Sequence, residues 1–305
     1  MVKSVTISKL STFSGTVKNL ASSKSISNRV QVLDALAGGG STIHNLSLAN
    51  DTQLMNNLLR SDAKVLDVED AGTTMRFLTA YYALLGREKT ITGTDRMKQR
   101  PIGILVDALR KIGAGINYPE KDGFPPVSIG NFGQQLTDSI TIRGDISSQY
   151  ISAMMMIAPK LPNGLTLNLT GKVGSKPYIE MTAALMKAFG VEAKFSDRSI
   201  YIPHGIYTPT EITIEPDWSS ASYWFAFVAM SEQADLVLPN LTLRSIQGDA
   251  VIVDIMEQLG VKAEPRGSGL LLAKMEHHDE IECDFSNCPD LAQTVSVVKS
   301  EGKRS

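Results

Sequence analysis

The sequence predicts an α/β protein assembled from repeated units, each of which runs strand, helix, strand, helix, strand, strand. Three observations carry this prediction. Amphipathic segments end at a glycine followed by an aliphatic stretch at Gly113, Gly190 and Gly260, at intervals of roughly 70 to 80 residues. Each interval holds two segments with a helical pattern, and short β-rich pieces lie between them. We expect such units to stack, because none of them can bury its apolar face alone.

The expected helices begin where capping residues or proline precede an apolar pattern. Pro101 and Pro177 stand in first turns, where the N–H that proline lacks would have no partner in the helix. Pro289 stands in the same way before a helix expected from Asp290 to Val298. The other expected helices are residues 72–85, 101–112, 147–158, 177–189, 219–230 and 249–259.

The expected strands are shorter than the helices. Residues 1–8 alternate polar and apolar side chains, as a strand with one buried face does. Between Asn50 and Asp70 the first repeat is short, so we expect it to lack its final strands. The clearest β-rich pieces elsewhere are residues 140–142, 165–169, 212–214 and 270–272.

Composition places the chain among folded proteins and excludes several classes of function. With 305 residues, 43% of them hydrophobic and 20% charged, it is long enough for two domains. A net charge of −2 disfavours nucleic-acid binding. No apolar run is long enough to span a bilayer, and the N-terminus lacks the apolar core of a signal peptide, so we expect a cytoplasmic protein.

The two cysteines, Cys283 and Cys288, form a weak candidate for a metal site with His277 and His278. Structural zinc requires four well-placed ligands, and these four residues do not show a zinc-binding spacing. We therefore expect reduced cysteines near the end of a strand, histidines on a polar turn, and no metal.

The segment from Ser23 to Arg29 points to anion binding. It combines one lysine, one arginine and three serines at the start of an expected helix. The first N–H groups of a helix lack intrahelical partners and carry the positive end of its dipole, so phosphate or carboxylate binds well there. An ordinary serine N-cap with solvated charges would explain one such segment equally well.

Recurrence favours the anion-binding interpretation. Hydroxyl-rich or glycine-rich starts precede four further apolar segments, which suggests that several helices are directed at one polyanionic ligand. These starts are Asp70 to Arg76, Ser147 to Gln149, Ser175 to Tyr178 and Asp217 to Tyr223.

Eight motifs follow one another along almost the whole chain. They are SKSISNR at Ser23, DAGTTMRFLTA at Asp70, TGTDRMKQRPIGILVDAL at Thr92, SSQYISAMMMIAP at Ser147, SKPYIEM at Ser175, DWSSASYW at Asp217, SIQGD at Ser245 and CPDLAQT at Cys288. In this order the motifs resemble those of the 3-phosphoshikimate 1-carboxyvinyltransferase (EPSP synthase) family. The resemblance implies transfer of the enolpyruvyl group of phosphoenolpyruvate to the 5-hydroxyl of shikimate 3-phosphate, through a tetrahedral intermediate and without metal or organic cofactor. We expect a monomer that takes these two small molecules as its partners.

The resemblance also implies the two-domain enolpyruvyltransferase fold, an inside-out α/β barrel built from repeated βαβαββ units. Residues 1–19 and 216–305 would form the first domain, and residues 20–215 the second, which holds three units and the shikimate 3-phosphate side. Full-length members continue beyond the last residue of this chain. We therefore expect a C-terminal truncation, an incomplete first domain and little activity.

Residues that match the family's shikimate 3-phosphate site come from three of the hydroxyl-rich helix starts. Lys24 would touch both substrates and take part in catalysis. Ser25 and Arg29 would hold the carboxylate of shikimate 3-phosphate. The other implied contacts are Ser147, Ser148 and Ser175 to its phosphate, Gln149 between the two ligands, and Tyr178.

The remaining matches concern phosphoenolpyruvate and proton transfer. Arg96 and the backbone around Gly72 would bind phosphoenolpyruvate, with Arg76 and Arg100 as nearby candidates. Asp290 would relay the proton of the reacting hydroxyl. Its position after a proline would equally suit an ordinary acidic residue in the first turn of a helix.

Two other functions remain open at this level. The chain could be a truncated, catalytically inert protein that only binds shikimate 3-phosphate. It could also resemble UDP-N-acetylglucosamine enolpyruvyltransferase, which shares the fold, although SKSISNR, SSQ and SKPY favour the shikimate enzyme.

Overall fold

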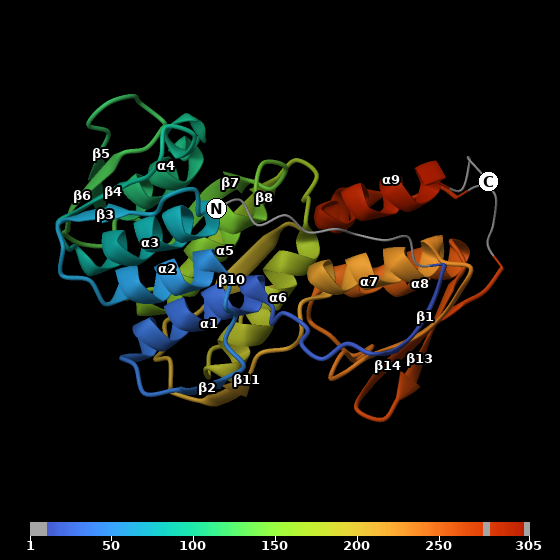
Figure 1. Cartoon of the computed structure of the whole chain (residues 1–305). Helices are drawn as coiled ribbons and strands as arrows, with labels where there is room; N and C mark the ends of the chain where they lie inside the picture. Colours follow the sequence, from blue (N-terminus) through green and yellow to red (C-terminus); the bar gives the residue numbers. More distant parts are fainter. Residues whose placement is uncertain (1–10, 277–280, 302–305) are drawn as a thin grey trace, which may run out of the picture. The chain divides into compact units, whose positions relative to one another are not determined.

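The computed structural model describes residues 11–276 and 281–301, with the last of these described by its backbone only. It divides into two compact units (Figure 1). Unit 1 comprises residues 1–21 and 215–305, and unit 2 runs from Ser22 to Ile214. The strand expected at residues 1–8 and the turn expected at His277 and His278 lie outside the described residues.

Unit 2 contains two complete repeats of the predicted kind. One runs β3, α3, β4, α4, β5, β6 and the other β7, α5, β8, α6, β9, β10. Their bounds are β3 (Val65–Asp67), α3 (Gly72–Leu85), β4 (Lys89–Thr92), η1 (Met97–Gln99), α4 (Gly103–Ile112), β5 (Ala114–Asn117), β6 (Val127–Phe132), β7 (Ser139–Arg143), α5 (Ser148–Ile157), η2 (Ala158–Lys160), β8 (Leu165–Thr170), α6 (Lys176–Ala188), β9 (Lys194–Phe195) and β10 (Ser199–Ile202).

The sheets of these repeats share one topology. The strand orders are β3-β4-β6-β5 and β7-β8-β10-β9. In each sheet the first two strands are parallel and the remaining pairs antiparallel. The first repeat is shorter, as expected: α1 (Lys24–Ala37), β2 (Thr42–His44) and α2 (Asn50–Leu59) precede β3. Among the described strands, β2 pairs only with β11 (Glu211–Thr213).

Helices occupy the middle of unit 2. Nearly all residues of α3 and α5 are buried, because both helices are apolar around most of their circumference. Strand β7, in contrast, alternates exposed and buried side chains and so faces solvent on one side. Figure 1 shows the helices gathered centrally, with β3 to β6 and the β2–β11 pair at the margins. This arrangement, with helices inside and sheets outside, is the one that the family resemblance implies.

The glycines expected at helix ends lie where predicted. Gly113 caps α4 in the left-handed conformation, with φ 114°. Gly190 and Gly260 follow α6 and α8 (Ile252–Gln258) with φ 92° and 86°. Glycine adopts such angles without steric cost, so each of these helices ends at its glycine or within two residues before it.

Several expected helices begin or end differently in the structure. The helix expected from residue 101 starts at Gly103, after Ile102 and Gly103 donate their N–H groups to the carbonyl of Gly123 at 2.8 and 3.1 Å. The segments expected as single helices at 249–259 and 290–298 each start as a 3₁₀ turn and then become α-helix. Such tight first turns are common at helix N-termini.

Unit 1 repeats the same sheet topology with strands from distant parts of the sequence. The order is β1-β12-β14-β13, with β1 parallel to β12. Helices α7, α8 and α9 lie on one side of this sheet (Figure 1). The bounds are β1 (Thr12–Thr16), α7 (Trp218–Met230), β12 (Gln233–Leu238), η3 (Gly248–Val251), α8 (Ile252–Gln258), β13 (Val261–Arg266), β14 (Gly269–Lys274), η4 (Phe285–Asn287), η5 (Pro289–Leu291) and α9 (Ala292–Glu301).

Candidate functional site

The first turn of α1 presents Lys24 next to a buried serine cap. The hydroxyl of Ser23 accepts the N–H of Ile26 at 3.4 Å, so Ser23 is the N-cap. The ammonium of Lys24 lies 3.5 Å from a carboxylate oxygen of Asp51. Both side chains are partly exposed, and an exposed ion pair is weak. Lys24 can therefore exchange Asp51 for an anionic ligand at little energetic cost.

Arg29 lies in the second turn of α1 and is only 2% exposed. Its Nε donates to the hydroxyl of Thr182 at 2.7 Å. Its two terminal nitrogens donate to the carbonyl of Ser25 at 2.9 Å and to the hydroxyl of Ser152 at 3.2 Å. These acceptors are all neutral.

Two aromatic rings also contact the Arg29 guanidinium. The rings of Phe77 and Tyr178 lie 5.3 and 5.8 Å from its central carbon. Burial lowers the pKa of Arg29 to about 10, and Tyr178 partly opposes this shift. Arg29 is therefore still charged at neutral pH, and its charge favours a nearby anion more strongly than it would in water.

The start of α5 is joined to the start of α3. The hydroxyl of Ser147 caps α5 by accepting the N–H of Gln149 at 3.3 Å, and Ser148 is buried behind it. The amide of Gln149 donates to the hydroxyl of Thr73 in α3 at 3.2 Å. A capping hydroxyl keeps its own proton, so Ser147 can still donate to an anion.

Ser175 precedes α6 in an unusual backbone conformation. Its φ of 53° lies in the left-handed region, which costs free energy for any residue with a Cβ. Its hydroxyl makes no capping bond to the helix. The carbonyl of Gly144, before α5, accepts the N–H of Gly174 at 3.1 Å, which holds the two helix starts together.

Arginines gather around the first turn of α3. The N-cap Ala71 supplies no side-chain bond, so the first N–H groups of α3 lack a side-chain cap. A Cβ on Gly72 would overlap the guanidinium of Arg100, which therefore approaches this turn closely only because residue 72 is glycine. Arg76 donates to the carbonyl of Gly72 at 2.7 Å and lies over the ring of Tyr150, and burial lowers its pKa.

The contacts of Arg29 and Gln149 thus bring the first two turns of α1, α3, α5 and α6 together in unit 2. Arg96 is exposed at the start of η1, and within the described part of the chain its side chain has no hydrogen-bond or ion-pair partner. Sequence reasoning missed Thr182 and Ser152. The signal for both was a lone hydroxyl inside an apolar helical pattern.

In unit 1 the predicted site residue Asp290 lies exposed in η5, and a second carboxylate is buried. Asp249 is 3% exposed and accepts a hydrogen bond from the hydroxyl of Ser219. Burial raises the pKa of Asp249 to about 6, and the charges of Asp290 and Asp217 add to the rise. Asp249 belongs to the SIQGD motif, which resembles the family's sequence. No feature of this motif predicted that its aspartate is buried.

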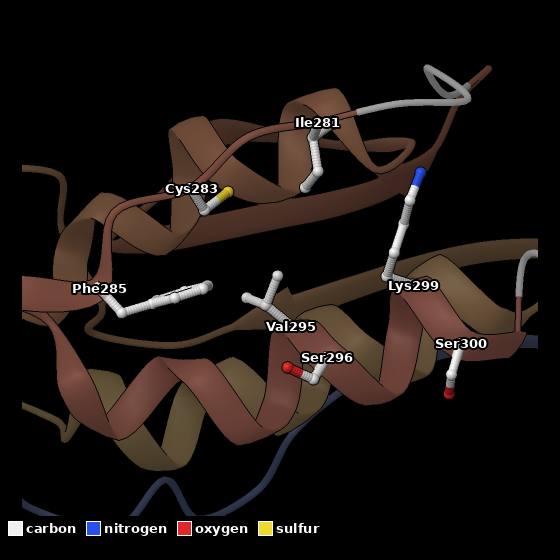
Figure 2. A pocket seen from close by; sticks show the side chains of 7 residues that line it. All are labelled: Ile281, Cys283, Phe285, Val295, Ser296, Lys299 and Ser300. Carbon is white, nitrogen blue, oxygen red and sulfur yellow. The ribbon is translucent and has the colours of Figure 1, made fainter.

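Unit 1 also contains a cavity of about 460 Å³ between residues 281–285 and α9. Figure 2 shows the side chains of Ile281, Cys283, Phe285, Val295, Ser296, Lys299 and Ser300 around it. None of the predicted site residues lines it. Burial raises the pKa of the thiols of Cys283 and Cys288, which lowers their reactivity.

Two classes of feature are absent from the part of the chain that the structure describes. Residues 11–276 and 281–301 contain no cluster of three or more potential metal ligands. No helix in these ranges combines the length and hydropathy that crossing a membrane requires.

The family model described as EPSP synthase (3-phosphoshikimate 1-carboxyvinyltransferase) matches residues 7–61 and 61–300. This chain belongs to the EPSP synthase family. The match includes all four helix starts that meet in unit 2 and also Asp290 in unit 1.

Curated members of the EPSP synthase family are similar over most of the chain. The 3-phosphoshikimate 1-carboxyvinyltransferase of Bacteroides fragilis (strain YCH46) is 48% identical over 284 residues, which are 91% of this chain and 68% of that protein. The one from Vibrio cholerae serotype O1 (strain M66-2) is 36% identical over 325 residues, with coverages of 97% and 75%. The one from Shewanella pealeana is 35% identical over 313 residues, with coverages of 93% and 72%.

Solved EPSP synthase structures share the fold. A structure of EPSP synthase from Acinetobacter baumannii superimposes with a TM-score of 0.73 over 93% of this chain and 69% of that one, at 20% identity. At this identity the likeness concerns the fold alone. It confirms the predicted enolpyruvyltransferase fold class.

Proposed function

We propose that this chain binds shikimate 3-phosphate in unit 2 and carries out the EPSP synthase reaction. In that reaction the enolpyruvyl group of phosphoenolpyruvate passes to the 5-hydroxyl of shikimate 3-phosphate, and inorganic phosphate leaves. The observation that supports the proposal best is the meeting of four helices within their first two turns, which carry hydroxyls and cations. Such turns bind phosphate and carboxylate through their N–H groups and dipoles.

Shikimate 3-phosphate carries two anionic groups, and unit 2 offers complementary groups for both. Lys24, Ser25 and Arg29 form the proposed carboxylate site. The uncompensated charge of Arg29 and the weak Lys24–Asp51 pair support this assignment. The proposed phosphate and ring contacts are Ser147, Ser148, Ser175, Gln149 and Tyr178.

Phosphoenolpyruvate would bind at the first turn of α3. The N–H groups after Ala71, which have no side-chain cap, and the close approach of the Arg100 guanidinium to Gly72 favour an anion there. Arg96 would supply a full charge, with Arg100 and Arg76 behind it. Charged groups that are already in place before the reaction lower its barrier more than groups that must reorganise during it.

Two residues would act on the reacting atoms. As the oxygen of the 5-hydroxyl bonds to C2 of phosphoenolpyruvate, Asp290 would accept the hydroxyl proton while C3 takes up a proton from solvent. Lys24 would then neutralise the phosphate group, which leaves as C3 loses a proton and the enol double bond forms again. We further propose that the protein is a cytoplasmic monomer. Light scattering during size-exclusion chromatography would test the monomer by its mass.

Titration of the purified chain with shikimate 3-phosphate tests the proposal. Lys24→Ala should weaken binding by about 1.5 to 3 kcal/mol, as loss of a bond to a charged group does. Lys187→Ala, which removes an exposed ion pair with Glu192 elsewhere in unit 2, is the matched control and should leave binding unchanged. Phosphate release with both substrates measures turnover. A folded chain with no affinity for shikimate 3-phosphate would contradict the proposal.

A further inference from the structure

Two buried hydroxyls from different helices hold the guanidinium of Arg29. Thr182 in α6 accepts from Nε at 2.7 Å, and Ser152 in α5 accepts from a terminal nitrogen at 3.2 Å. The two hydroxyl oxygens lie 2.9 Å apart. Both side chains are completely buried, so neither can contact a ligand while the helices keep this packing.

These contacts fix the plane of the guanidinium. An arginine head is planar and presents five N–H donors in a rigid fork, so bonds along one edge orient the whole group. The Nη1 atom donates to the carbonyl of Ser25 at 2.9 Å. The hydroxyls therefore also hold the first turn of α1, which carries Lys24 and Ser25.

The acceptors orient Arg29 without neutralising it. A carboxylate in the place of Thr182 would hold the same nitrogen but would cancel the positive charge. Hydroxyls satisfy the buried donors and leave the charge available to an external anion. A site that binds a carboxylate therefore has a higher affinity for it when hydroxyls, and not a carboxylate of the protein, accept the hydrogen bonds of Arg29.

We propose that Thr182 and Ser152 are positioning residues for carboxylate binding at the start of α1. They act through Arg29 and touch no ligand. The inference rests on the proposed function, because it names the carboxylate of shikimate 3-phosphate as the group that the oriented Arg29 and the first turn of α1 recognise.

If Thr182 had a purely structural role, its replacement would act only through the loss of a buried hydroxyl that bonds within its own helix, and would weaken the binding of both kinds of ligand equally. Its hydroxyl also lies 2.8 Å from the carbonyl of Tyr178, one helical turn earlier. Thr79 in α3 is an exact match in this respect: it is fully buried and donates to the carbonyl of Met75 at 2.7 Å. Thr79 has no hydrogen bond to a cation among the described residues, which makes Thr79→Val the control for loss of a buried helical hydroxyl.

Calorimetry with two probes tests the inference. One probe is shikimate 3-phosphate, and the other is its analogue with the carboxylate reduced to an alcohol. Thr182→Val should weaken binding of shikimate 3-phosphate about tenfold, at the lower end of the effect of one bond to a charged group, and binding of the alcohol by less than about twofold. Thr182→Ser should restore the affinity, Ser152→Ala should act like Thr182→Val, and Thr79→Val should change neither probe.

Equal weakening of both probes by Thr182→Val, or no rescue by Thr182→Ser, would overturn the inference. A readout that needs no ligand is the Nε–H proton of Arg29 in NMR spectra. This proton should exchange with water slowly in the wild type and in Thr182→Ser, and rapidly in Thr182→Val. If the wild type binds neither probe, the proposed function fails, and the inference about ligand binding fails with it. If the wild type binds shikimate 3-phosphate and Thr182→Val binds it equally well, this inference alone is overturned.

Discussion

Asp249 shows how one buried residue links stability to pH. Its carboxyl lies in unit 1 at the start of η3 and is 3% exposed. The hydroxyl of Ser219 satisfies one oxygen, and the other has no hydrogen-bond partner among the described residues. Burying a charge with so few partners is unfavourable, so the neutral form is favoured in the folded state.

We expect Asp249 to make unit 1 less stable as the pH rises from about 4 to about 6. The folded carboxyl has a pKa of about 6, against 3.8 for an ordinary aspartate, so the folded state binds more protons in this window. The free energy of unfolding must then fall with rising pH, by roughly 2 to 3 kcal/mol in total. Asp249→Asn should remove this part of the pH dependence and raise stability above pH 6.

Urea unfolding between pH 4 and pH 7 measures the effect. The exposed aspartate Asp235 lies in the same unit, and Asp235→Asn is the control that should keep the wild-type slope. Identical pH profiles for the wild type and Asp249→Asn would show that the buried carboxyl does not control stability in this range.

At the scale of the elements, the helix starts of unit 2 differ in what they leave available. α1 and α5 have serine caps whose hydroxyls accept a backbone N–H. α3 and α6 begin without a side-chain cap, so their first N–H groups have no such acceptor. Uncapped starts make a helix less stable, and such a cost is common at binding sites.

Ser175 before α6 should show this conflict between stability and binding. Ser175→Gly removes a left-handed residue with a Cβ, so we expect the protein to become more stable by up to about 1 kcal/mol. The same change removes a proposed phosphate ligand and should weaken shikimate 3-phosphate binding. Thermal unfolding and calorimetry on one sample measure both effects.

Glu69→Gly provides the comparison. Glu69 is also left-handed, with φ 49°, and is not among the proposed ligands. Glu69→Gly should stabilise the protein by a similar amount, reduced by the loss of the exposed hydrogen bond between Asn50 and Glu69. The affinity for shikimate 3-phosphate should not change. Unchanged affinity in Ser175→Gly would remove Ser175 from the proposed site.

At the scale of the whole molecule, unit 2 contains every residue proposed to bind the carboxylate or the phosphate of shikimate 3-phosphate. Its sheets, including the pair of β2 and β11, close within Ser22 to Ile214. We expect residues 22–214 alone to fold and to bind shikimate 3-phosphate with the affinity of the whole chain. Calorimetry on both proteins decides this, and a folded unit 2 with much lower affinity would show that unit 1 contributes to binding.

The sequence by itself determined the features that depend on neighbouring residues. Glycines at 113, 190 and 260 mark helix ends because only the local backbone conformation matters there. The serines at 23 and 147 cap helices because an N-cap bonds to an N–H only two or three residues later. The repeat of these signals was enough to predict the α/β fold class and the hydroxyl-rich helix starts.

Only the tertiary structure decided which of these elements meet. Thr182 and Arg29 are 153 positions apart in the sequence, and no local pattern pairs them. Strand β1 completes a sheet whose other strands follow residue 230, and the burial of Asp249 depends on that unit's packing. Such contacts depend on the packing of whole helices and sheets against one another, which a reading of short segments does not contain.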